Sequence, residues 1–159
     1  MKKELIQDYT MRITQASRSE LIVIMYEIIL NDMVSAREAF AAADFVTYEH
    51  ELSHAGRFVN ELMASLDYSI GLSYHLMSLY IYANKELTAA KTKRQPELLT
   101  GVEEVFEKLV AGYQKVSEED ISGPVMKNTQ QVYAGLTYGR GTLHEMYVNV
   151  NESRRGFMA

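Results

Sequence analysis

The residues best suited to chemistry are His50, Glu51 and His54, which form the pattern H-E-x-x-H. On a helix this spacing places two imidazoles on one face to bind zinc, with the glutamate as general base for a metal-bound water. A catalytic zinc also needs a third protein ligand. No later His, Asp or Glu stands out as that ligand, and Glu61 lies two turns further along the same helix. A zinc hydrolase is therefore the weakest hypothesis for this chain.

The helix that would carry this motif also argues against catalysis. Its apolar positions include Tyr48, Leu52 and Ala55, so we expect His50 and His54 to face solvent, where they could bind only an adventitious metal. A di-iron bundle site needs two inward Glu-x-x-His pairs and two further glutamates, and the chain supplies one pair. We expect no catalytic residue, no functional metal and no cofactor.

The composition indicates one globular domain. The chain has 159 residues, of which 47% are hydrophobic and 23% charged, and it lacks cysteine, which excludes a disulfide framework and is compatible with a cytoplasmic location. Its net charge is −5 and its 16 basic residues are dispersed, so we expect no nucleic-acid partner. The longest apolar stretch, residues 21–26, is too short to insert into a membrane, and we expect no signal peptide.

The elements that position these residues are four helices between residues 17 and 120. Each has the hydrophobic period of an α-helix, without strand alternation. A capping box, Ser17 with Glu20, opens the first, and Pro96 opens the fourth. We expect bounds of residues 17–40, 44–67, 69 or 71 to 93, and 96 to about 118–120. Their short connections predict an all-α fold, an antiparallel up-down-up-down four-helix bundle.

The apolar positions predict which faces are buried. The first helix is apolar over more than half of its circumference, so we expect it to contact two different surfaces. The other three have inward seams at regular helical spacing. The expected seam residues are Phe45, Tyr48, Leu52, Ala55, Val59, Leu62 and Leu66 in the second helix, Leu72, Leu76, Leu79, Ala83, Leu87 and Ala90 in the third, and Leu98, Val102, Val105, Leu109 and Val116 in the fourth.

Several short motifs in this order resemble the FliS family of flagellar export chaperones. They are ASRSEL at residues 16–21, IMYE at 24–27, ELMASLD at 61–67 and LYIY at 79–82. The resemblance covers residues 6–118. The chain departs from the family pattern at two places. Arg18 replaces the usual proline, and the tryptophan often found late in the fourth helix is absent.

This resemblance implies a cytoplasmic chaperone that binds the disordered C-terminal region of flagellin in hydrophobic grooves between helices. It would prevent premature polymerisation before type III flagellar secretion, with the export apparatus as a second candidate partner. The family's I-x-x-Y element makes Ile6 and Tyr9 candidates for a displaceable cap. Our candidate groove residues are Met25, Tyr26, Ile29, Tyr80 and Tyr82.

The expected organisation is therefore an N-terminal cap segment (1–16), a four-helix bundle (17–120) and a C-terminal extension (121–159). In the extension we expect a short fifth helix over residues 125–136 and irregular chain beyond it. One alternative function stays open beside the zinc hydrolase. The surplus apolar surface could instead make a structural or regulatory bundle that homodimerises. We expect a monomer or a weak homodimer.

Overall fold

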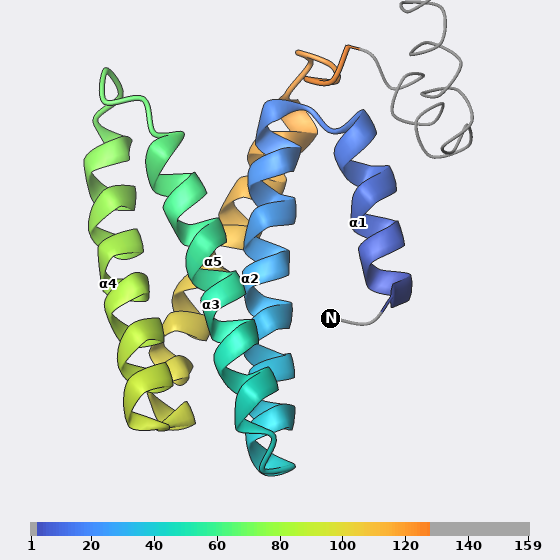
Figure 1. The fold of residues 1–159 in the computed structure, drawn as a ribbon. Coiled ribbons are helices and arrows are strands. Elements are labelled where there is room, and N and C mark those ends of the chain that lie inside the picture. Colours follow the sequence, from blue (N-terminus) through green and yellow to red (C-terminus); the bar gives the residue numbers. More distant parts are fainter. Residues whose placement is uncertain (1–2, 128–159) are drawn as a thin grey trace, which may run out of the picture. The chain divides into compact units, whose positions relative to one another are not determined.

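The computed structural model describes residues 3–127, which form five α-helices and a short 3₁₀ turn (Figure 1). No strand occurs within these residues. The elements are α1 (Lys3–Gln15), α2 (Arg18–Ala41), α3 (Phe45–Ala64), α4 (Leu72–Lys93), η1 (Pro96–Leu98) and α5 (Leu99–Glu119).

Helices α2 to α5 form the predicted up-down-up-down bundle. Helix α2 packs against α3 and α5, and α4 closes the ring by packing against the same two helices. The contact between α4 and α5 is the least extensive of the four. Helix α1 lies outside the ring along α2 (Figure 1). The fold is therefore a four-helix bundle with an additional N-terminal helix.

The helix ends follow from local sequence. Ser17 and Glu20 form the predicted capping box, in which the Ser17 N–H donates to the Glu20 carboxylate over 2.7 Å and the Glu20 N–H donates to the Ser17 hydroxyl. Asp44 caps α3 by accepting from the Thr47 amide. Arg94, directly after α4, adopts a left-handed conformation and donates its backbone N–H to the Ala90 carbonyl. These contacts satisfy backbone groups that helix ends leave unpaired.

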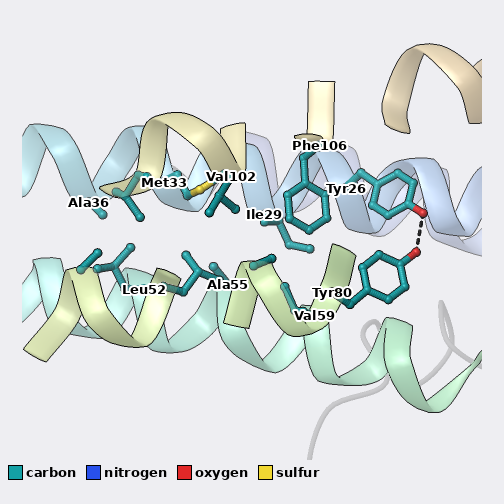
Figure 2. Packing of buried hydrophobic residues seen from close by; sticks show 14 of the residues in the cluster. Tyr26, Ile29, Met33, Ala36, Leu52, Ala55, Val59, Tyr80, Val102 and Phe106 are labelled. Carbon is teal, nitrogen blue, oxygen red and sulfur yellow. Dashed lines mark hydrogen bonds between the residues drawn. The ribbon is translucent and has the colours of Figure 1, made fainter. Parts of the chain in front are cut away.

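The core runs along the centre of the bundle and is drawn in Figure 2. The predicted seam of α3 is confirmed from Tyr48 to Leu62, where its five residues are buried. Phe45 and Leu66 at its ends are only partly buried, and Leu66 lies beyond the end of α3. The α4 seam differs from our prediction. Leu72 is exposed and Leu79 is only partly buried, whereas Ser73 and Tyr80 are buried. The observed register keeps an unbroken 3-4 spacing; its positions are Ser73, Leu76, Tyr80, Ala83, Leu87 and Ala90.

Helix α5 also buries a different set of residues from the expected one. Leu99, Val102 and Phe106 are buried, while Val116, near the end of the helix, is exposed. Figure 2 shows Phe106 and Tyr26 side by side in the core. The last turns of α5 therefore contribute less to the core than the sequence pattern suggests.

Two further observations concern the ends of the described chain. We predicted a cap segment and no helix before Ser17, yet Lys3–Gln15 is helical. At the other end, residues 125–127 are not helical, and the rest of the predicted fifth helix, residues 128–136, lies outside the described residues. Among the described helices, none combines the length and apolarity needed to cross a membrane.

Candidate partner-binding site

A second apolar cluster, separate from the bundle core, lies beneath α1. Helix α1 and the residue after it contribute Tyr9 and Ala16, and α2 contributes Ile24 and Ile28. Partly buried residues packed against these four complete the cluster; they are Leu5, Ile13, Leu21 and Phe58. This arrangement confirms that α2 contacts two surfaces, because its opposite side carries Tyr26, Ile29 and Met33 into the bundle core.

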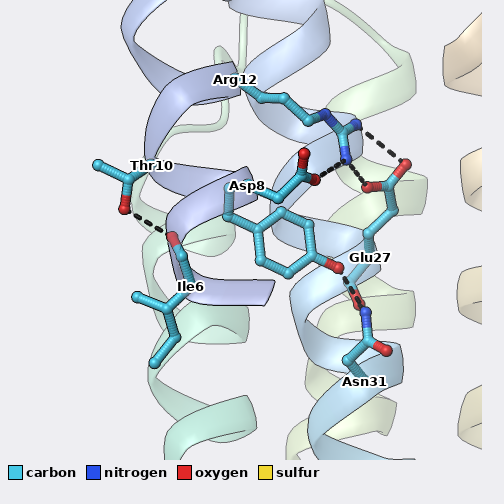
Figure 3. Close-up of polar contacts among 7 residues, drawn as sticks. Ile6, Asp8, Thr10, Arg12, Glu27 and Asn31 are labelled. Atoms are coloured by element: carbon cyan, nitrogen blue, oxygen red, sulfur yellow. Dashed lines mark hydrogen bonds and ion pairs between the residues drawn. The ribbon is translucent and has the colours of Figure 1, made fainter. Parts of the chain in front are cut away.

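Polar side chains of α1 form hydrogen bonds and ion pairs with α2 (Figure 3). The Arg12 guanidinium donates to both carboxylate oxygens of Glu27 over 2.6 and 3.2 Å, and lies 3.8 Å from Asp8. The Asn31 side-chain amide donates to the Tyr9 hydroxyl. Burial, followed by the charge of Glu27, raises the pKa of Tyr9, so this hydroxyl stays protonated near neutral pH.

The attachment of α1 is modest in energy. The Arg12 and Glu27 side chains are 41% and 23% exposed, and ion pairs of that exposure contribute at most about 1 kcal/mol. The apolar cluster beneath α1 comprises four buried and four partly buried residues and is much smaller than the bundle core. Helix α1 is therefore held by less extensive contacts than the four helices of the bundle.

The two predicted cap residues have different positions. Tyr9 is buried against α2. Ile6 is 48% exposed and projects away from α2 in Figure 3. The α1 residues that contact the cluster are spaced by four, four and three positions; they are Leu5, Tyr9, Ile13 and Ala16. That spacing is a helical signal which our sequence interpretation did not use.

A second surface is an open hollow of about 300 Å³ at one end of the bundle. It lies where α2 and α4 begin and α3 and α5 end. Its lining combines apolar side chains with Arg18 and Asp67. The apolar lining residues are Ile22, Leu62, Leu66, Ile70, Leu72, Leu76, Tyr80 and Tyr113. Ile70 and Leu72 are both more than half exposed, so this end of the bundle presents apolar surface to solvent.

The five predicted groove residues are divided between core and surface. Tyr26 and Ile29 are fully buried in the core, and a partner could reach them only if the bundle opened. Tyr80 is buried in the core, and its edge borders the hollow. Met25 packs partly buried against the core. Tyr82 is 39% exposed, and its hydroxyl lies over Gly101 of α5. The accessible part of the predicted set is thus Tyr82, Met25 and an edge of Tyr80.

Three tyrosine hydroxyls meet beside the hollow. The Tyr26 and Tyr80 oxygens are 2.5 Å apart (Figure 2), and the Tyr113 ring packs edge-on against Tyr26. Burial raises the pKa of all three, that of Tyr80 to about 12. They remain neutral near pH 7 and act as hydrogen-bonding groups rather than as acids or bases.

The H-E-x-x-H motif was the strongest metal-binding pattern of the sequence. Within residues 3–127, no group of three or more His, Cys, Asp or Glu side chains is placed to hold a metal. The expectation that both histidines face solvent is wrong for His54. Its Nδ1 lies 2.6 Å from Oδ2 of Asp32, and its ring packs against Phe58. The cause is Asp32, a buried carboxyl on α2 that our sequence interpretation did not single out.

Comparison with protein families identifies residues 1–120 as matching the family described as flagellar protein FliS. The chain belongs to the FliS family. The matched residues include α1 and end where α5 ends. FliS proteins are flagellar chaperones and not enzymes, so this FliS-family chain is not a zinc hydrolase.

A solved structure supports the fold of this FliS protein independently. It is described as a flagellar chaperone from bacteria and superposes with a TM-score of 0.62 at 17% identity, covering 72% of this chain and 98% of that one. At this identity the likeness concerns the fold alone. No curated protein sequence matches the chain.

Proposed function

We propose that this FliS protein is a cytoplasmic export chaperone that binds the disordered C-terminal region of flagellin and prevents its polymerisation before secretion. The observation that carries the proposal is the apolar surface of α2 and α3 that α1 covers. Family membership supports the choice of partner. No catalytic group is required, because binding alone keeps an apolar segment from self-association.

In this proposal α1 occupies part of the flagellin site in the free protein. Its departure would expose Leu21, Ile24 and Ile28 on α2 together with Phe58 on α3. An amphipathic segment with anchors at helical spacing suits such a surface. Since α1 belongs to the same chain, it competes at a high local concentration. Flagellin would therefore bind with an affinity reduced by the fraction of molecules in which α1 is closed.

The hollow is a second contact for the same partner. Tyr68 and Tyr74, whose ring centroids lie 5.6 Å apart, stand near the α3–α4 connection that borders it. Exposed aromatic side chains supply large contact area at low entropic cost. A long disordered region can engage two separated surfaces at once, so we include the hollow and Tyr82 in the proposed site.

The test is calorimetry with a peptide from the flagellin C-terminus, using the intact chain and a chain lacking residues 1–14. We expect a one-to-one complex with a gain of helicity by circular dichroism. We also expect the shortened chain to bind at least about tenfold more tightly, corresponding to an α1 that is closed in about nine molecules of ten.

Two matched variants distinguish an effect of detaching α1 from the effect of losing any surface ion pair. Arg12→Gln removes the pair between α1 and α2, while Arg37→Gln removes a similarly exposed pair between α2 and α5. We expect the first to tighten binding and the second to leave it unchanged. Equal affinity with and without residues 1–14 would reject the cap. A chain that ignores the peptide but dimerises in sedimentation experiments would support the structural bundle instead.

A further inference from the structure

Residues 120–125 follow α5 and pass the connection between α1 and α2 (Figure 1). We call this segment the strap. At its start, the Asp120 carboxylate accepts hydrogen bonds from the backbone N–H of Ser19, over 3.3 Å, and from the Ser19 hydroxyl. At its end, Val125 donates its N–H to the Ala16 carbonyl over 3.1 Å. The strap is therefore bonded both to the α1–α2 connection and to the first turn of α2.

The groups that the strap reaches are ones that helix ends leave without partners. Ala16 directly follows the last residue of α1, and Ser19 is the second residue of α2. The first amides of a helix have no intrahelical acceptor, and a carboxylate is favoured there by the helix dipole. Hydrogen bonds from Ser122 and Ser19 lower the pKa of Asp120, so this carboxyl is charged near neutral pH. The strap thus completes the end of one helix and the start of the next.

Hydrogen bonds rather than apolar packing hold the strap in place. Ile121 is fully exposed and Val125 is about half exposed. The Ser122 N–H donates to Oδ1 of Asp120 over 3.0 Å, and Gly123 has a φ of 73°, in the left-handed region that favours glycine. These two features turn the chain so that Val125 reaches the connection. Removing single hydrogen bonds should therefore release the strap.

We propose that the strap positions α1, by fixing the α1–α2 connection in the geometry in which α1 covers the apolar surface of α2 and α3. For α1 to swing away, the backbone at Ala16 and Ser17 must rotate, and the Ala16 carbonyl then leaves the N–H of Val125. Because α1 is held by less extensive contacts than the bundle helices, a few hydrogen bonds at this connection change its opening equilibrium. The end of α5 is thereby coupled to the opening of α1.

The test is amide hydrogen exchange of the full chain, followed by NMR at one pH near 7, for the wild type, Asp120→Ala and Val125→Pro. The proline removes the N–H that reaches Ala16. We expect the amides of α1 to exchange about fivefold faster in each variant, the effect of losing one hydrogen bond of ordinary strength. Core amides of α3, which exchange only when the whole bundle unfolds, should respond less.

Asp44→Ala is the matched control. Asp44 is also an exposed carboxylate at the start of a helix, and it accepts from the backbone N–H and the hydroxyl of Thr47. This substitution should leave the exchange of α1 unchanged. Unchanged α1 exchange in both strap variants, or an equal acceleration in Asp44→Ala, would overturn the proposal. Should Asp120→Ala weaken the whole bundle by uncapping α2, Val125→Pro decides the question, because it leaves that cap intact.

The consequence for partner binding rests on the proposed function. With α1 closed in about nine molecules of ten, a fivefold easier opening lowers the closed fraction to about two in three. The flagellin peptide would then bind about three- to fourfold more tightly to either strap variant than to the wild type. The two proposals fail separately. Faster exchange in a chain that ignores the peptide would support the strap and reject the partner, whereas tight peptide binding with unchanged exchange would reject the strap alone.

Discussion

The hydroxyl group of Tyr26 offers a sharp test of how the hollow end of the bundle is held together. Tyr26 is fully buried on α2, and its oxygen lies 2.5 Å from that of Tyr80 on α4. Its hydroxyl also interacts with that of Tyr113 on α5. Replacing Tyr26 or Tyr80 by phenylalanine removes an oxygen and leaves the ring, so neither substitution creates a large cavity.

The burial of each hydroxyl sets the expected magnitudes. Removing one partner of a buried hydrogen bond costs about 1–3 kcal/mol, because the other partner is left unsatisfied, whereas removing both can be nearly neutral. Tyr26→Phe leaves the hydroxyls of Tyr80 and Tyr113 without their hydrogen-bond partner, and we expect it to lower the free energy of unfolding by about 2 kcal/mol. Tyr80→Phe leaves the Tyr26 hydroxyl bonded to that of Tyr113, so we expect a loss of about 1 kcal/mol. The double variant should cost clearly less than the sum of the two.

The assay is a double-mutant cycle from urea unfolding followed by circular dichroism at constant pH near 7, where all three hydroxyls are neutral. We expect a coupling free energy of at least about 1 kcal/mol between Tyr26 and Tyr80. Additive effects would show that the two hydroxyls do not depend on each other. That outcome would refute a closed hydrogen-bonded link between α2 and α4 at this end.

Two further predictions concern helix ends and helix contacts. Ser17→Ala breaks the capping box with Glu20 and should lower the free energy of unfolding by about 1 kcal/mol, whereas Ser78→Ala, on the exposed side of α4, should change it by less than about 0.5 kcal/mol. Gly101→Ala places a Cβ 2.4 Å from the Tyr82 hydroxyl oxygen; its gain in helix propensity of up to about 1 kcal/mol should appear in a Tyr82→Phe background and be smaller in the wild type. Equal effects in both backgrounds would contradict the close approach of α4 and α5.

The bundle was predictable because its signals are local and repetitive. The capping box at Ser17 and the 3-4 spacing from Tyr48 to Leu62 each specify an element without knowledge of its neighbours. Tyr80 shows the limit of such signals. Because residues 79–82 are all apolar or aromatic, a seam through Leu79 and a seam through Tyr80 fit the sequence equally well. Only packing against Tyr26 of α2 and Phe106 of α5 selects the seam that buries Tyr80.

The site was harder to predict because it depends on contacts between distant residues. Asp32 looks like an ordinary polar position on a helix, and nothing in its neighbourhood along the chain indicates that His54 will meet it. Helix α1 was missed for another reason. The I-x-x-Y resemblance directed attention to Ile6, although the positions that pack are in register with Tyr9 and not with Ile6.

The separation of the two apolar clusters has a consequence for how this chaperone can evolve. Among the described residues only Phe58 packs against both, so the contacts beneath α1 and those inside the bundle are almost independent sets. Substitutions at Leu5 or Ile13 can alter how readily α1 opens without eroding the thermodynamic stability of the bundle. Selection can in this way adjust occupancy by a partner over a wide range while the folded scaffold stays the same.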